Sequence, residues 1–452
     1  MSKCSCGNCD LEVFGNSDKC ILHCDKTKYY ENKYELNHTQ ILSKDKMLKE
    51  FETKFIEIYY KEINEDILIL SYIHFPEDSF NKLLEIINSI RIQIFKCKFY
   101  ENIGLKKENL NKKLEYLNFF NCDMNMINIV HINTDIVIDI YDCNFKKLCV
   151  QFAKLNELKI NKVKSLNIIK VNDSTIDCLS ISDSSLNYLG FFNGTNKKTI
   201  LKNVKIENTG FNTTFLDRLD FIDVEIKNKI DLQNSFIPTN SSFFGLKSSK
   251  GILDVSNRET ARKIKDSFEK QNNIIEANKY YALEMKEREK ELEEDIREGK
   301  NIFEWLVFKI HGLSSNHSQD WTLALFWIIN LTFFYSYLYK NIEDYFELTS
   351  ILKILFSCIA ISVIACMTIK IPEENKERRW FTTIPTTIVC YIFYGYLVET
   401  DWQLSEFSKN LNPFSIMRGD EPITLGTLIF KIIIAYLIYQ LIISIRQNTR
   451  RK

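Results

Sequence analysis

The chain has 452 residues, 45% of them hydrophobic, and its 59 basic side chains balance its 59 acidic side chains. A formal charge of zero leaves no basic face for nucleic acid, so nucleic acid is not an expected partner. The length allows two or three domains. Eight of the thirteen cysteines lie in the repetitive and apolar regions described below, where we expect them as small core residues rather than as disulfides.

The other five cysteines crowd the first 24 residues. Two Cys-x2-Cys/His pairs separated by ten residues have the spacing at which thiolates and an imidazole close a tetrahedron around Zn²⁺. A segment with so few apolar groups needs such a cross-link to hold a fold, and a disordered cysteine-rich start is the alternative. The sequence therefore predicts a structural zinc site in residues 1–30. Its ligands are Cys6, Cys9, Cys20 and His23, with Cys4 and Cys24 as rivals.

Residues 31–93 predict a small α/β cap. Apolar side chains at helical spacing favour a helix over 40–63, an apolar run favours a strand over 66–74, and a second short helix is expected over 80–90. Such elements can cover the open end of a stack of β-strands, whose unpaired edges would otherwise invite aggregation.

Between residues 166 and 226 an apolar side chain recurs at every fifth position, with Asn196 the single exception among thirteen places. A helix repeats near 3.6 residues and a strand at 2, so a spacing of five requires the chain to turn a corner about every five residues. Fixed internal periods of this kind indicate a solenoid, in which each coil stacks on its neighbours. The series is Leu166, Val171, Ile176, Ile181, Leu186, Phe191, Leu201, Ile206, Phe211, Leu216, Phe221 and Ile226.

The pentads often carry a small or aliphatic residue two places before the central one, as in the runs KVNDS TIDCL SISDS SLNYL. These runs resemble pentapeptide-repeat proteins, and the resemblance covers residues 94–237. It implies a right-handed, four-sided β-helix with both side chains turned inward, which we expect over 94–256. The small position is often too large here, so the repeat is degenerate. An antiparallel sandwich with accidental spacing is the alternative. The N-terminal Cys/His pattern is similar to a short tag found on some bacterial pentapeptide-repeat proteins.

Residues 257–320 predict a connector. A long helix is expected over 257–299, and its run KEREKELEEDIREGK favours a solvated helix braced by i,i+4 pairs; a helix that couples the solenoid to a membrane is the alternative. Residues 302–313, IFEWLVFKIHGL, have few charges and suit a helix on the cytoplasmic leaflet.

Residues 321–452 predict a membrane domain of four helices, because four nearly uncharged stretches of roughly 20 residues each match the thickness of the hydrocarbon core. Basic residues gather in the link between the second and third stretches and in the tail, whereas the other links are acidic. The positive-inside rule then puts both termini in the cytoplasm. No cleaved signal peptide is expected, since the first apolar run begins beyond residue 30. The four spans are 321–339, 351–371, 381–398 and 423–445.

Two polar residues interrupt the last predicted span. Lys431 lies near its midpoint and Gln440 lies further toward the cytoplasm. A central lysine costs about 2.5–3.5 kcal/mol on insertion scales unless it is paired or hydrated. We expect Lys431 either to act as an anchor or to face an aqueous or inter-subunit cavity.

The order of solenoid, charged helix and apolar helices resembles bacterial pentapeptide-repeat membrane proteins, some of them channel-like. No potassium-type filter occurs between the spans, because the corresponding link reads NPFSIM. No phosphate loop, nucleophile elbow or metalloprotease helix occurs either, so no enzymatic activity is expected. Together with a composition rich in lysine and asparagine, the resemblance predicts a bacterial inner-membrane protein that scaffolds or senses a cytoplasmic protein partner, or self-associates. A solenoid-gated oligomeric channel and a membrane-anchored stress or immunity effector are the alternatives.

Overall fold

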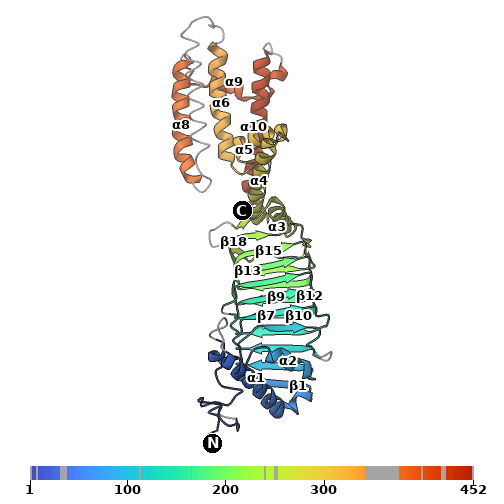
Figure 1. Ribbon diagram of the computed structural model, residues 1–452. Helices are drawn as coiled ribbons and strands as arrows, with labels where there is room; N and C mark the ends of the chain where they lie inside the picture. Colours follow the sequence, from blue (N-terminus) through green and yellow to red (C-terminus); the bar gives the residue numbers. More distant parts are fainter. Residues whose placement is uncertain are drawn as a thin grey trace. The chain divides into compact units, whose positions relative to one another are not determined.

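The computed structural model describes residues 3–6, 9–30, 38–110, 114–163, 165–238, 241–248, 253–341, 376–398, 401–418 and 424–449 (Figure 1). The chain divides into two compact units, Met1–Asn273 and Ile274–Lys452. The first unit contains a β-solenoid and the second is helical.

The N-terminal part of the first unit packs around aromatic side chains. Helix α1 (His38–Tyr59) and helix α2 (Ser79–Ile86) bear out the two helices expected in the cap region. Phe51 and Phe55 of α1 are buried, and both rings contact Phe75 of strand β2 (His74–Phe75). Phe75 also contacts Phe80 of α2, so one aromatic cluster joins these elements. Two short 3₁₀ helices, Thr27–Tyr29 and Glu62–Asn64, complete this part.

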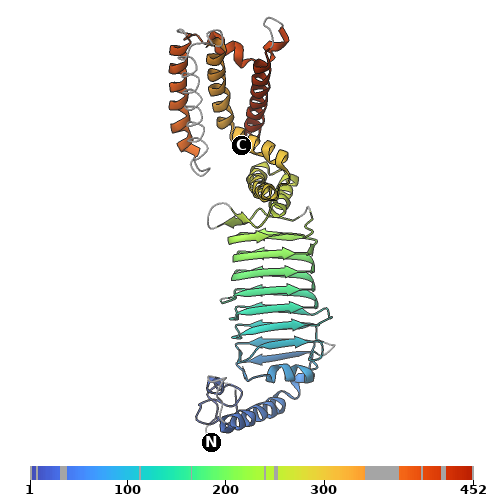
Figure 2. The same ribbon diagram turned by 45° about the horizontal axis from the view of Figure 1, so that its top comes forward.

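The solenoid consists of two nine-stranded sheets in which every pair of neighbouring strands is parallel. Its ladder begins at β1, earlier than the predicted residue 94, and Figure 2 shows the strands stacked as successive rungs. One sheet contains β1 (Ile67–Ser71), β3 (Arg91–Phe95), β6 (Tyr116–Phe120), β8 (Val137–Tyr141), β10 (Lys154–Asn161), β12 (Thr175–Ser182), β14 (Thr195–Lys202), β16 (Phe215–Leu216) and β17 (Leu219–Ile222). The other contains β5 (Ile103–Lys106), β7 (Met126–Val130), β9 (Lys147–Gln151), β11 (Ile168–Asn172), β13 (Ser185–Phe192), β15 (Lys205–Asn212), β18 (Val224–Asp231), β19 (Leu246–Ser248) and β20 (Asp254–Val255). Strand β2 pairs separately with β4 (Lys98–Phe99).

The five-residue series forms the interior of this stack. All thirteen pentad centres between residues 166 and 226 are at most 2% exposed, including Asn196. Ile181 pairs with Leu201 and Phe191 with Phe211, so one coil takes 20 residues and each centre lies directly over its counterpart in the next coil. The period therefore arises from a parallel solenoid, and the sandwich alternative is wrong.

The corners explain why small polar residues recur two places before the centre. A residue with a left-handed backbone follows most strands of the stack, and Asp and Asn adopt that conformation more readily than other non-glycine residues. The residue that follows turns inward: the Ser174 hydroxyl accepts the N–H of Ala153 at 3.1 Å, and Ser184 accepts that of Val163 at 3.1 Å. The corner residues of the regular coils are Asp173, Asp183, Asn193, Asn203, Thr213 and Asp223.

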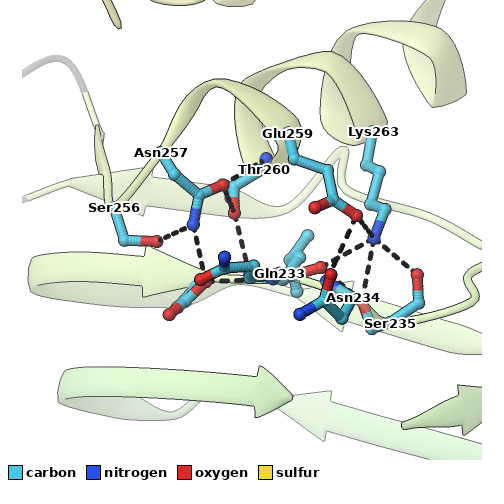
Figure 3. A network of polar contacts seen from close by, with 10 residues as sticks. Gln233, Asn234, Ser235, Ser256, Asn257, Glu259, Thr260 and Lys263 are labelled. Atoms are coloured by element: carbon cyan, nitrogen blue, oxygen red, sulfur yellow. Dashed lines mark hydrogen bonds and ion pairs between the residues drawn. The ribbon is translucent and has the colours of Figure 1, made fainter. Parts of the chain in front are cut away.

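Helix α3 (Arg258–Lys270) covers the last coil of the solenoid (Figure 3). Its N-cap, Asn257, accepts the N–H of Thr260 at 2.9 Å, and the Thr260 hydroxyl accepts the backbone N–H of Leu232 at 2.9 Å. The Lys263 ammonium donates to the carbonyls of Leu232 and Ser235 at 2.8 and 2.5 Å. The helix thereby satisfies polar backbone groups that the next coil would otherwise pair.

The single helix predicted over 257–299 is wrong, because the chain forms α3 and then α4 (Ile274–Arg297). Asn272 has a left-handed backbone with φ 55°, and the N–H of Asn273 returns to the carbonyl of Phe268 at 2.9 Å. This arrangement is typical of a helix C-terminus, and asparagine is among the residues that adopt it most easily.

The helical unit continues with α5 (Ile302–Ser315), α6 (Trp321–Asn341), α8 (Lys376–Leu397), α9 (Ser405–Leu411), a 3₁₀ helix (Pro413–Arg418) and α10 (Leu425–Thr449). Helix α6 packs against α10 on one side and α8 on the other (Figure 1). Tyr335 donates to Thr427 at 2.9 Å near one end of the α6–α10 pair, and Gln319 donates to Gln447 at 3.3 Å near the other. The two helices are therefore antiparallel.

Two described helices are long and apolar enough to cross a membrane, Trp321–Tyr339 and Leu425–Gln447. They correspond to the first and last of the four predicted spans. The predicted span 351–371 lies outside the described residues. The predicted span 381–398 is helical, as part of α8, but it is not one of the two, since a proline and four threonines lower its hydropathy. Within the part of the chain that the structure describes, two of the four predicted spans are therefore long and apolar enough to cross a membrane.

Candidate functional site

The cysteine-rich start folds into two turns that face each other. Backbone hydrogen bonds join Cys4 to Leu11 at 2.9 Å and Phe14 to Lys19 at 2.9 Å, which folds the segment back on itself. The N–H of Cys9 then bonds the carbonyl of Cys6 at 3.0 Å, and a similar turn spans the second pair, Cys20-x2-His23. Short turns of this kind are how paired ligands reach one ion.

Four side chains converge between these turns. Ligand atoms of Cys4, Cys9, Cys20 and His23 all lie within 4.8 Å of one another. The sulfurs of Cys9 and Cys20 are 3.6 Å apart, and His23 Nδ1 lies 3.6 Å from the Cys4 sulfur and 3.2 Å from the Cys20 sulfur. Ligands at about 2.3 Å (S) and 2.1 Å (N) from one tetrahedral ion would lie about 3.6–3.8 Å apart. The cluster can therefore hold a metal ion.

Three of the four predicted ligands belong to this cluster, and Cys4 takes the place of Cys6. The Cys4 sulfur accepts the N–H of Cys20 at 3.2 Å. Cys6, in the bend at residues 5 and 6, is not among the four converging side chains, although its thiol interacts with that of Cys4. Burial acts to raise the pKa of the Cys4 thiol, but hydrogen bonds from backbone N–H groups outweigh it and lower that pKa. Cys24, the other rival, instead points its thiol toward the carbonyl of Ile21 at 3.7 Å.

The electrostatics of the cluster favour a cation. Burial raises the pKa of the Cys20 thiol to about 12, so its thiolate form requires a positive charge close by. Three thiolates and a neutral imidazole around a divalent ion leave one net negative charge. Lys26 is 0% exposed; burial lowers its pKa to about 8, and the negative charges of Cys24 and Cys20 act against that shift. This buried ammonium is placed to balance an anionic metal complex.

The second turn is bound to the first coils of the solenoid. The carbonyl of Leu22 accepts the N–H of His74 at 2.8 Å, and the hydroxyl of Tyr100 accepts the N–H of Lys26 at 2.8 Å. Tyr100 also donates to the carboxylate of Asp25 at 2.9 Å. All four candidate ligands are protein groups, so the site suits structural cross-linking or docking rather than catalysis.

Comparison with protein families, with curated proteins and with solved structures found no match to this chain.

The structure places Lys431 against protein rather than in a cavity. Its side chain is 4% exposed, and its ammonium donates to the carbonyls of Lys409, Asn410 and Asn412 at 3.0, 2.8 and 2.9 Å. These carbonyls lie at the C-terminal end of α9, where a cation is also favoured by the helix dipole. Lys431 thus links α10 to the C-terminal end of α9 through hydrogen bonds.

Gln440 belongs to a separate polar site at the junction of α5 and α6. Its side-chain carbonyl accepts from Ser315 at 3.0 Å and from Ser318 at 3.2 Å. Because Ser318 donates to Gln440, the contact of 3.2 Å between Ser318 and His311 Nε2 requires that nitrogen to donate. Gln440 was predicted as a polar residue of the last span, but its partners Ser315, Ser318 and His311 were not, although the polar run SSNHSQD between two apolar segments was a visible signal.

Proposed function

We propose that the protein is an integral membrane scaffold or sensor, which displays a pentapeptide-repeat-type β-solenoid in the bacterial cytoplasm and engages a protein partner or a second copy there. The proposal places the chain in the inner membrane with both termini inside. The four-sided, right-handed form of the solenoid and the two further spans, 351–371 and 381–398, are part of the same proposal.

The exposed apolar surface of α10 is the main support for the membrane assignment. Only 33% of its apolar stretch is buried, and large apolar side chains are exposed along its whole length. A water-soluble core helix would bury such residues, whereas hydrocarbon suits them. The antiparallel pairing of α6 and α10 also supports the topology, because the start of α6 and the end of α10 then lie on one side of the membrane. The exposed residues of α10 are Leu425, Leu428, Ile429, Ile432, Ile433, Tyr439, Ile442 and Ile445.

Alkaline carbonate extraction of cells tests the membrane assignment. The full chain should stay in the membrane pellet, and a reporter that is active only in the cytoplasm should be active when fused after residue 452. Release of the chain into the soluble fraction would contradict the proposal. An inactive C-terminal reporter on a chain that stays in the membrane would contradict the topology alone.

For the cysteine-rich cluster we propose zinc in a structural role. Thiolates with one imidazole select zinc over the hard cations magnesium and calcium. The ion would join the two turns, and the contacts with His74 and Tyr100 would fix the module on the solenoid.

The weaker alternative is an oligomeric channel gated by the solenoid. Lys431 was the residue that favoured it, and its bonds to three backbone carbonyls favour an anchoring role instead. Planar bilayer recordings of the purified full chain separate the two: the scaffold proposal expects no single-channel events, and reproducible unitary currents would favour the channel.

A further inference from the structure

Helix α5 has two unlike long faces. Six large apolar side chains follow one another at helical spacing on one face, and none of them is buried. Phe303 is 86% exposed and Val307 is 66% exposed, values far above those of apolar residues in the solenoid interior. The apolar face consists of Ile302, Phe303, Leu306, Val307, Ile310 and Leu313.

Charged residues on the rest of α5 are held by α4. Glu304 accepts from Arg288 at 2.5 Å, and Lys309 pairs with Glu289 at 2.5 Å and Glu293 at 3.0 Å. These contacts commit the polar side of α5 to the neighbouring helix. The apolar face of α5 therefore remains exposed and can contact another surface.

The last turn of α5 lies beside the two candidate spans. Trp327 Nε1 donates to the carbonyl of Leu313 at 2.9 Å, and Trp327 lies six residues, about 9 Å, inside α6 from its first residue, Trp321. Ser315 bonds Gln440 of α10 at 3.0 Å. If the spans cross a bilayer, this end of α5 lies at the depth of the boundary between headgroups and acyl chains.

We propose that the apolar face of α5 binds the lipid surface of the leaflet where α6 begins and α10 ends, with α4 held against its charged side. This inference rests on the proposed membrane function. Lipid is favoured over a protein partner because exposed apolar residues of α10, Ile442 and Ile445, lie near the same end. An apolar face at this depth matches an interfacial amphipathic helix, whose charged side remains outside the hydrocarbon.

Depth-dependent fluorescence quenching tests whether the apolar face of α5 lies in the lipid. A fluorescent amino acid is placed at Val307, at exposed Glu298 as the matched control, or at exposed Ile432 near the middle of α10. The full chain is reconstituted in vesicles of phosphatidylcholine and phosphatidylglycerol whose acyl chains carry bromine at a shallow or a deep position. We expect shallow bromine to quench position 307 severalfold more than position 298, and deep bromine to quench position 432.

Each other outcome is informative. Quenching at 307 no stronger than at 298, with 432 quenched by deep bromine, would overturn the inference and leave the membrane function standing. Absence of quenching at 432 would overturn the membrane function itself. Energy transfer between probes at 307 on different chains, without quenching, would show that a second copy covers the face, and would also overturn the inference.

Discussion

The solenoid and the helical unit distribute polar side chains in opposite ways. Inside the solenoid the pentad centres are almost all apolar, and buried polar residues such as Ser174 and Ser184 lie at corners where they bind backbone groups. In the helical unit, Lys431 and Gln440 are buried while α10 exposes apolar side chains along its length. Water suits the outside of the first arrangement and hydrocarbon the outside of the second. The placement of polar atoms, rather than the composition of the chain, distinguishes the two units.

The cysteine-rich module differs from both units, because we expect its fold to depend on a bound metal ion rather than on a packed interior. Structural zinc contributes about 10–16 kcal/mol of apparent free energy in small zinc-binding peptides, so losing a ligand should unfold the module. We expect one zinc per chain in the native protein and in Cys6→Ser, and little zinc in Cys4→Ser. Mass spectrometric metal analysis of the full chain measures this, with hydrogen exchange of residues 3–30 as the readout of folding.

The matched pair Cys4→Ser and Cys6→Ser decides between the two ligand sets. Equal loss of zinc in both variants would contradict the cluster geometry, since Cys6 is not among the four converging side chains. Full zinc content in Cys4→Ser, with loss in Cys6→Ser, would restore the ligand set predicted from spacing.

A second prediction tests whether the solenoid interior is the source of its stability. Phe211 is fully buried and stacks on Phe191 with a ring separation of 4.9 Å, whereas Phe152 is 56% exposed at a corner. Phe211→Ala should lower the free energy of unfolding by about 3–5 kcal/mol, and Phe152→Ala should change it by less than about 0.5 kcal/mol. Chemical denaturation of the full chain in detergent, followed by the β-sheet circular dichroism, measures both. Similar losses in the two variants would contradict the assigned interior.

The solenoid could be predicted because its constraint is local and repeated. Every fifth side chain points inward, so the pattern from Leu166 to Ile226 reported burial directly, and even the exception, Asn196, is inside. The exact ligands could not be predicted from spacing alone. Cys4 and Cys6 both lie near Cys9 in sequence, and the bend at residues 5 and 6 depends on backbone pairing with residues further along the chain.

The helical unit was less predictable for a related reason. Apolar content identified α6 and α10 as candidate spans, but it did not show what Lys431 binds, because α9 is about 20 residues distant in sequence. The break between α3 and α4 was missed although Asn272 and Asn273 interrupt the charged stretch there, and asparagine readily adopts the left-handed backbone that ends a helix.

The third prediction concerns the buried lysine of α10. Lys431→Met removes the donor to three carbonyls and should cost about 1.5–3 kcal/mol, the usual contribution of hydrogen bonds to a charged group. Lys409→Met is the control, since its ammonium is exposed and pairs with Glu406, an interaction worth little. Thermal unfolding in detergent and protease cleavage within residues 405–418 report the effect. A Lys431→Met protein with native stability and protease resistance would contradict the anchoring role.

The smallest effect is expected at the break in the pentad series. Asn196 lies in register between Ile176 and Leu216; its amide donates to Thr199 at 3.3 Å, and its Oδ1 has no partner within the described residues. In the native protein the unpaired, buried acceptor of Asn196 costs about 1–3 kcal/mol of stability. Asn196→Leu removes this cost, but it also removes the hydrogen-bond partner of Thr199. We therefore expect the free energy of unfolding to rise by roughly 1 kcal/mol, which a higher denaturation midpoint would show. Asn208→Leu, on the exposed face of β15, should leave it unchanged. A lower midpoint for Asn196→Leu would mean that the solenoid interior at this coil requires a polar group, unlike the coils on either side.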